Sequence, residues 1–196
     1  MASSTEFQNV RREMRRFSLP FVAPGRILSL VGPVTIDRCT LLADSVRRLD
    51  REGTSPILLV VDTIGGSSIG AQIVAAVISF CRSPTIGLVI SRAASAGFTV
   101  LQACDLRLAL ATSYVMTHYT NLRDPETPIT NARSIDSLQD WMQMRMSFRK
   151  AMWTRQEESL CRLTGLDPER IKEMLGRDRD VSAMEAFQLG FIDGIV

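Results

Sequence analysis

Two turns of small residues carry the groups of this chain that are best suited to chemistry. They are Asp62-Thr63-Ile64-Gly65-Gly66-Ser67 and Ala93-Ala94-Ser95-Ala96-Gly97, and each follows an apolar, strand-like run. The only histidine of the chain, His118, lies a short way downstream. A serine in a tight turn, a glycine pair that leaves room for a reacting carbonyl, and one imidazole together indicate a serine peptidase site.

Each of these groups has a role in the predicted reaction. A serine hydroxyl is a poor nucleophile until a base removes its proton, and His118 is the imidazole that can do so for Ser95. We expect the backbone amides of Gly65 and Ala96 to bind the oxyanion. Losing one such donor typically raises the barrier by about 3 kcal/mol. The predicted reaction is acyl transfer through an acyl-serine, with water as the second nucleophile.

Length, charge and cysteine content limit the class of protein. The chain has 196 residues, of which 45% are hydrophobic, so it can fill one core and does not require two domains. We expect a single domain over 18–196.

Charge and cysteine spacing exclude several kinds of site. A net charge of +2 provides no global field for holding nucleic acid or an anionic membrane. The four cysteines lack the CxxC spacing of a zinc or redox site, and neither a metal nor an organic cofactor is indicated.

The N-terminal segment, residues 1–17, differs from the rest of the chain. It contains four arginines but no apolar stretch of signal-peptide length, and nothing later in the chain approaches a membrane span. We expect a flexible or partner-ordered tail and a cytoplasmic protein. An organellar location stays open, because arginine-rich starts are also typical of transit peptides.

Apolar periodicity predicts alternating strands and helices, which is typical of a layered α/β fold. The nearly continuous apolar run over 56–61 indicates a strand covered on both faces. Each small-residue turn falls directly after a predicted strand. The predicted strands cover 26–31, 56–61, 85–90, 106–110, 114–117 and 191–196, and the predicted helices cover 37–53, 69–80 and 96–103.

The pattern changes after His118. Two prolines and several polar residues predict a loop over 119–131. A helix over about 132–164 follows, and its stripe of methionines suits adaptable packing or a contact between subunits. Capping signals at Asp167-Pro168 and at Ser182-Ala183-Met184-Glu185 predict two further short helices.

Four segments of the chain, taken together and in this order, carry a resemblance to a known family. They are Gly65-Gly66-Ser67, Ala93-Ala94-Ser95-Ala96-Gly97, Val115-Met116-Thr117-His118, and Arg177-Asp178-Arg179-Asp180-Val181-Ser182-Ala183-Met184-Glu185-Ala186 followed by Gly190-Phe191-Ile192-Asp193. With these segments in the family's order and at family-like intervals, the chain resembles the proteolytic subunits of the Clp peptidase family from about residue 58 to its end. It departs from the family at Thr63-Ile64, where the family usually has Ser-Pro, and over its N-terminal third.

The resemblance implies that Asp178 completes a triad with Ser95 and His118, and that Gly66 and Ser67 bind substrate. It also implies a ClpP/crotonase-type α/β fold of repeated ββα units, in which the region about 119–164 protrudes as a handle.

Family members form rings of seven subunits, and two rings enclose a chamber into which an ATPase partner feeds unfolded protein. The resemblance therefore implies homo- or hetero-oligomeric rings, as a heptamer or double heptamer, that cut unfolded proteins or peptides as a serine endopeptidase. The sequence has no Walker A phosphate loop, so ATP hydrolysis, where it is needed, must come from another chain, and the resemblance implies a separate AAA+ ATPase for that role.

Each motif taken singly also has a simpler interpretation. Ser95 suits a helix cap, His118 a structural hydrogen bond, Asp178 a solvated charge between two arginines, and the glycine pair an ordinary turn. All four together favour catalysis. Two alternatives stay open: a catalytically silent or misaligned ring subunit, and a crotonase-type acyl-CoA enzyme, which usually needs acidic residues at its site.

Overall fold

The computed structural model describes residues 22–119 and 135–196 and divides into two units. The first unit consists of two stretches of the chain, one up to Thr117 and one over Asp178–Val196. The second unit is the stretch between them, His118–Arg177. The predicted tail over 1–17 and nearly all of the predicted loop over 119–131 lie outside the described residues. The single domain expected over 18–196 stays a prediction.

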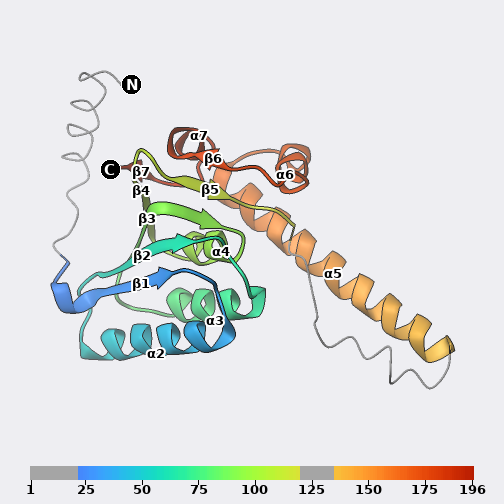
Figure 1. Ribbon diagram of the computed structural model, residues 1–196, viewed down its shortest axis with the longest axis horizontal. Helices are drawn as coiled ribbons and strands as arrows, with labels where there is room; N and C mark the ends of the chain where they lie inside the picture. The colour runs from blue at the N-terminus through green and yellow to red at the C-terminus, as the bar shows by residue number, and fades with distance from the viewer. Residues whose placement is uncertain (1–21, 120–134) are drawn as a thin grey trace. The chain divides into compact units, whose positions relative to one another are not determined.

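A seven-stranded sheet organises the first unit (Figure 1). Its main path runs β1-β2-β3-β4-β7 with parallel neighbours, whereas β5 pairs with β3 in parallel and with β6 in antiparallel fashion. The strands are β1 (Ile27–Val31), β2 (Ile57–Thr63), β3 (Thr85–Ala94), β4 (Leu106–Ala109), β5 (Tyr114–Met116), β6 (Val181–Ser182) and β7 (Gly194–Ile195).

The central strand β3 has two partners on the same side. It pairs with β4 from Ile86 to Val89 and with β5 from Arg92 to Ala94. Between these stretches its register against β2 shifts, as expected for a bulge, which bends a strand and increases its twist. Across this register shift, β3 exchanges β4 for β5 as its neighbour.

Helices cover the sheet of the first unit, and two more form the second unit (Figure 1). In the first unit α2 packs on β1 and α3, α3 packs on α4, and α4 packs on β2 and β3, whereas α5 packs on α6 in the second. The helices are α2 (Ile36–Glu52), α3 (Ser68–Ser79), α4 (Ala96–Gln102), α5 (Ile135–Thr164), α6 (Pro168–Leu175) and α7 (Ala183–Gln188), preceded by the 3-10 turn η1 (Pro24–Arg26).

Side-chain caps fix where several of these helices begin. The side chains of Ser67, Asp167 and Ser182 each accept a hydrogen bond from the backbone amide three residues later. Such a bond satisfies one of the amides that the first helical turn leaves unpaired. The two predicted capping signals, before α6 and before α7, are thus confirmed.

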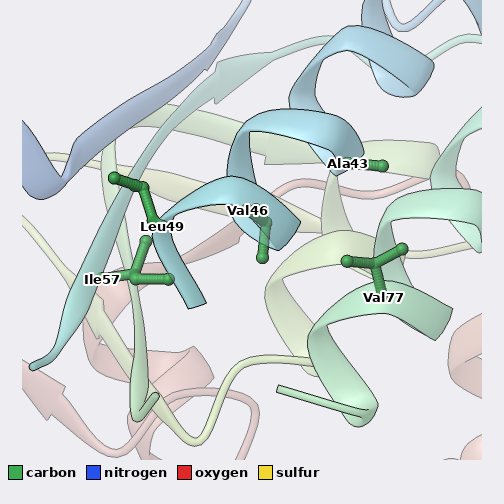
Figure 2. Close-up of a cluster of buried hydrophobic side chains, with 5 residues drawn as sticks. All are labelled: Ala43, Val46, Leu49, Ile57 and Val77. Carbon is green, nitrogen blue, oxygen red and sulfur yellow. The ribbon is translucent and has the colours of Figure 1, made fainter. Parts of the chain in front are cut away.

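A cluster of buried aliphatic side chains joins α2, α3 and β2 (Figure 2). Ala43, Val46 and Leu49 follow one another at intervals of three along α2 and meet Ile57 of β2 and Val77 of α3. This spacing gives α2 one apolar face. The cluster holds the first helix layer against the sheet that carries the glycine turn.

The α/β fold class predicted from the sequence is confirmed, and most predicted elements agree with the structure to within a few residues. Two predicted ends are wrong: β3 continues past residue 90 to Ala94, and the last strand is only Gly194–Ile195. The first two residues of the predicted serine turn therefore belong to β3. β6 and η1 were not predicted, because two or three residues are too few to show a periodicity.

Removing the side chain of Leu49 tests the core. Leu49→Ala is expected to lower the free energy of unfolding by about 2–5 kcal/mol, because Leu49 is 1% exposed and its loss leaves a cavity. Leu41→Ala is the matched control on the same helix, and it should change stability by less than about 0.5 kcal/mol because Leu41 is 69% exposed. Urea denaturation measures both, and equal losses would contradict the assignment of the core.

Candidate active site

Ser95 lies in a strained turn between β3 and α4. Its backbone has φ 53° and ψ −114°, and it is the one non-glycine residue with positive φ in the described part of the chain. Such a conformation costs about 1–3 kcal/mol and persists only where the surroundings enforce it. The surroundings do so here, because Ala94 and Ala96 on either side are buried and the Ser95 amide donates to the Met116 carbonyl oxygen at 2.8 Å. A sharp turn from strand to helix is the geometry that presents the nucleophilic serine in the α/β-hydrolases.

The glycine turn approaches the backbone of this serine turn closely. A Cβ placed on Gly65 would lie 2.8 Å from both the Ala94 carbonyl oxygen and the Ser95 Cβ, and 3.2 Å from the Ala96 amide nitrogen. Gly65 also has φ +98°, which side-chain-bearing residues rarely adopt. The structure thus brings together three predicted site residues, Gly65, Ser95 and Ala96, and the close approach requires glycine.

Thr63 is a residue of this site that the sequence analysis missed. The Gly65 amide, predicted to bind an oxyanion, donates to the Thr63 side-chain oxygen at 3.0 Å. The methyl of Thr63 faces Gly97, where an added Cβ would lie 2.2 Å away. The one sequence signal was that Thr63-Ile64 replaces the family's usual Ser-Pro. The buried Thr63 side chain therefore ties the glycine turn to the start of α4.

Gly66 and Ser67, predicted to bind substrate, contact the connection between β1 and α2. Gly66 pairs with Val34 in a parallel bridge, and an added Cβ would lie 2.2 Å from the Val34 carbonyl oxygen. The Ser67 amide donates to that same oxygen at 2.8 Å, while its hydroxyl accepts from the Gly70 amide and caps α3. These bonds fix the backbone of the glycine turn, and the role of both residues in substrate binding stays a prediction.

The other two predicted triad members lie in different units. Asp178 is an exposed residue of the first unit and comes three residues before β6, the antiparallel partner of β5. His118 is the first residue of the second unit, two residues along the chain from the end of β5. Within that unit its carbonyl oxygen accepts a hydrogen bond from the Gln156 side chain at 2.8 Å. The alignment of Ser95, His118 and Asp178 as a triad stays a prediction.

Two ion pairs hold the segment that contains Asp178. Asp180 accepts two hydrogen bonds, at 3.0 and 2.9 Å, from the guanidinium of Arg92 on β3. Arg179 pairs with Glu185 of α7. Both pairs are partly exposed, so each contributes at most about 1 kcal/mol, and together they define where the chain re-enters the first unit. Sequence analysis missed the pairing of Arg92 with Asp180, which joins β3 to a residue just before β6, far along the chain.

The described residues offer no other obvious reactive centre. All four cysteines are free, and burial raises the pKa of the Cys104 thiol to about 12, so this thiol stays protonated at neutral pH. In the described part of the chain, no three His, Cys, Asp or Glu side chains gather as metal ligands would. Over the same residues, no helix combines the length and apolar character needed to cross a membrane.

Comparison with known proteins identifies the family. The family model described as Clp protease matches residues 21–196, which is nearly the whole chain. The chain belongs to the Clp protease family. The predicted resemblance is thus confirmed, and the match also takes in the N-terminal third, where the sequence analysis noted departures from the Clp pattern.

Individual Clp relatives are similar at a modest level. The chain is 29% identical over 178 residues to the ATP-dependent Clp protease proteolytic subunit 2 of Prochlorococcus marinus (strain MIT 9313), covering 87% of this chain and 82% of that protein. It is 30% identical, with the same coverage, to the ATP-dependent Clp protease proteolytic subunit 3 of a Synechococcus strain. A solved structure of a ClpP1 mutant from Listeria monocytogenes superposes with a TM-score of 0.75 at 18% identity, over 88% of this chain and 91% of that one. The predicted ClpP-type fold is therefore confirmed.

Adding a methyl group at Gly65 tests the close approach of the two turns. Gly65→Ala is expected to destabilise the protein by about 2 kcal/mol or more, because the methyl meets the Ala94 carbonyl oxygen and the Ser95 Cβ at 2.8 Å and a positive φ is unfavourable for alanine. Gly25→Ala is the matched control, since an added Cβ there meets nothing within 4 Å. Thermal unfolding compares the two, and an unchanged midpoint for Gly65→Ala would mean that the turns lie further apart.

Proposed function

We propose that this chain is a serine endopeptidase subunit that hydrolyses unfolded proteins or peptides. The observation that carries the proposal is the strained turn at Ser95, packed against Gly65 at the ends of two adjacent parallel strands. Strain of this kind is retained where it positions a reactive group. Membership of the Clp protease family supports the same reaction.

The proposed mechanism uses three side chains and two amides. The Ser95 hydroxyl oxygen attacks the scissile carbonyl while His118 takes its proton, and Asp178 accepts the other ring N–H and stabilises the imidazolium. The amides of Gly65 and Ala96 bind the oxyanion. His118 then returns the proton to the leaving amine, and water hydrolyses the acyl-serine by the same steps.

The bond between Gly65 and Thr63 adds one requirement to this mechanism. An oxyanion takes the Gly65 amide only when the Thr63 hydroxyl releases or shares it. A charged acceptor forms a stronger hydrogen bond than a neutral hydroxyl, so the exchange is favourable once charge develops. The same bond also favours the second candidate function, a silent ring subunit, in which the amide stays with Thr63.

The long helix α5 supports the proposal of an oligomer. It exposes four large apolar side chains, Met142, Met144, Met146 and Phe148, which are each more than half exposed. Exposed apolar side chains in such a group are typical of contacts between proteins. We propose that this helix contacts other subunits of homo- or hetero-oligomeric rings, and that a separate AAA+ ATPase delivers substrate, as the name ATP-dependent Clp protease of the relatives suggests.

Removing the Ser95 hydroxyl tests the nucleophile. Ser95→Ala is expected to abolish labelling by a fluorophosphonate probe and to lower peptide hydrolysis by at least about a thousandfold. Ser79→Ala is the control, because Ser79 is an exposed serine whose hydroxyl bonds only within its own helix turn. A wild-type chain that neither binds the probe nor cuts peptides would favour the silent subunit.

A charge placed on α5 tests the proposed oligomer. Met146→Asp is expected to lower the native mass and the peptidase activity together, because it puts a carboxylate where an apolar contact is proposed. Met146→Leu keeps the apolar surface and should change neither. Native mass spectrometry and peptide hydrolysis measure the pair, and a monomeric variant with full activity would refute the link.

A further inference from the structure

One face of α5 holds the backbone at His118 and Tyr119. Trp153, Gln156 and Glu157 occur at positions i, i+3 and i+4 of this helix, a spacing that places their side chains on one face. All three contact residue 118 or residue 119, and all these residues belong to the second unit. The face they form is called the His118 cradle below.

Gln156 bonds directly to the residue that carries the imidazole. Its side-chain nitrogen Nε2 donates to the His118 carbonyl oxygen at 2.8 Å in a partly buried setting. A hydrogen bond to this carbonyl restricts rotation of the peptide that follows the His118 Cα. It thereby limits the directions in which the ring can point.

The next residue is held by three further contacts. The Tyr119 amide donates to the Leu175 carbonyl oxygen at 3.1 Å, and the Tyr119 hydroxyl donates to Glu157 Oε1 at 2.7 Å. The Tyr119 ring lies 4.8 Å from the Trp153 ring, measured between centroids. Burial and the Glu157 carboxylate raise the pKa of Tyr119 to about 12, so its hydroxyl keeps the donated proton throughout the neutral range.

These contacts restrain the peptide unit between His118 and Tyr119 at both its carbonyl oxygen and its amide. The two residues have little freedom left, because His118 is held at its carbonyl and Tyr119 at its amide, ring and hydroxyl. A general base needs that restraint, because a displacement of about 1 Å can cost a hundredfold in rate. An irregular segment that follows a three-residue strand would otherwise supply little of it.

We infer that Gln156 is a positioning residue for the general base, and that it acts through its hydrogen bond to the His118 carbonyl in the His118 cradle. The inference rests on the proposed function, in which His118 is the base. Gln156 acts on the base and does not itself contact the substrate. Tyr119, held by Glu157 and Trp153, is the second anchor of the same peptide.

Gln156→Met is the variant that tests the inference. Methionine keeps the length and volume of the side chain but cannot donate to the carbonyl. We expect kcat for a fluorogenic peptide to fall about ten- to a hundredfold while KM changes less than twofold. Fluorophosphonate labelling of Ser95 should slow by a similar factor, because the base activates the same hydroxyl in both reactions.

A second measurement does not depend on activity. His118 is the only histidine in the chain, so selective ¹³C labelling of histidine gives a single imidazole Cε1–H signal. In Gln156→Met this signal should shift or broaden relative to wild type, because the ring samples more orientations. Gln188→Met is the matched control, since it makes the same change at an exposed position of α7, outside the helix proposed to contact other subunits.

The outcomes separate failure of the inference from failure of the proposed function. Unchanged kcat and an unchanged His118 signal in Gln156→Met would overturn the inference, as would equal effects of Gln188→Met. If the wild-type chain neither labels nor cuts peptides, the proposed function fails. The imidazole signal then still decides whether Gln156 orients the ring.

Discussion

The contact between the glycine turn and the serine turn is the constraint on which the rest of the site depends. Backbone meets backbone there, since a side-chain atom on Gly65 would fall within 3 Å of Ser95 and its neighbour. Such proximity requires β2 and β3 to lie side by side in parallel, because the carboxyl ends of parallel neighbours emerge at the same edge of a sheet. The fold serves the site by bringing these two ends together.

The bulge in β3 refines that arrangement. β4 ends where it pairs with Val89, and past the register shift β3 pairs with β5 instead, so that the Ser95 amide donates to the Met116 carbonyl oxygen at the end of β5. That hydrogen bond joins the serine turn to the strand that leads toward His118. One irregularity in one strand therefore connects two of the three segments from which the proposed triad is drawn.

Sequence reasoning found the elements more readily than the details that join them. Apolar periodicity and capping residues predicted α2, α3 and β2 because these signals are local. The bulge in β3 was not predicted, because a strand buried on both faces lacks the alternation that would reveal its register. Nor could spacing predict that Gln156 meets His118, since the two are 38 residues apart and join only through the fold of the second unit.

In the candidate site, too, the sequence showed the residues with local signals and missed those defined by tertiary contacts. The motif around Ser95 and the glycine pair identified three residues that lie together, because small residues in tight turns leave a strong signal. Thr63 was missed, since a threonine at the end of a strand has the same appearance whether or not its hydroxyl binds the next turn. Partners of backbone amides are set by tertiary contacts, and a single sequence does not record them.

The forked pairing of β3 has a consequence for stability. The branch that fixes the Ser95 turn relies on β5, with three residues, and on β6, with two, whereas β1 to β4 form a longer ladder. Short strands at the margin of a sheet fray at a lower free energy than the whole domain unfolds. Ser95, the proposed nucleophile, therefore depends on a section of sheet that opens at a lower free energy than the main body, and such local opening would switch the proposed activity off reversibly.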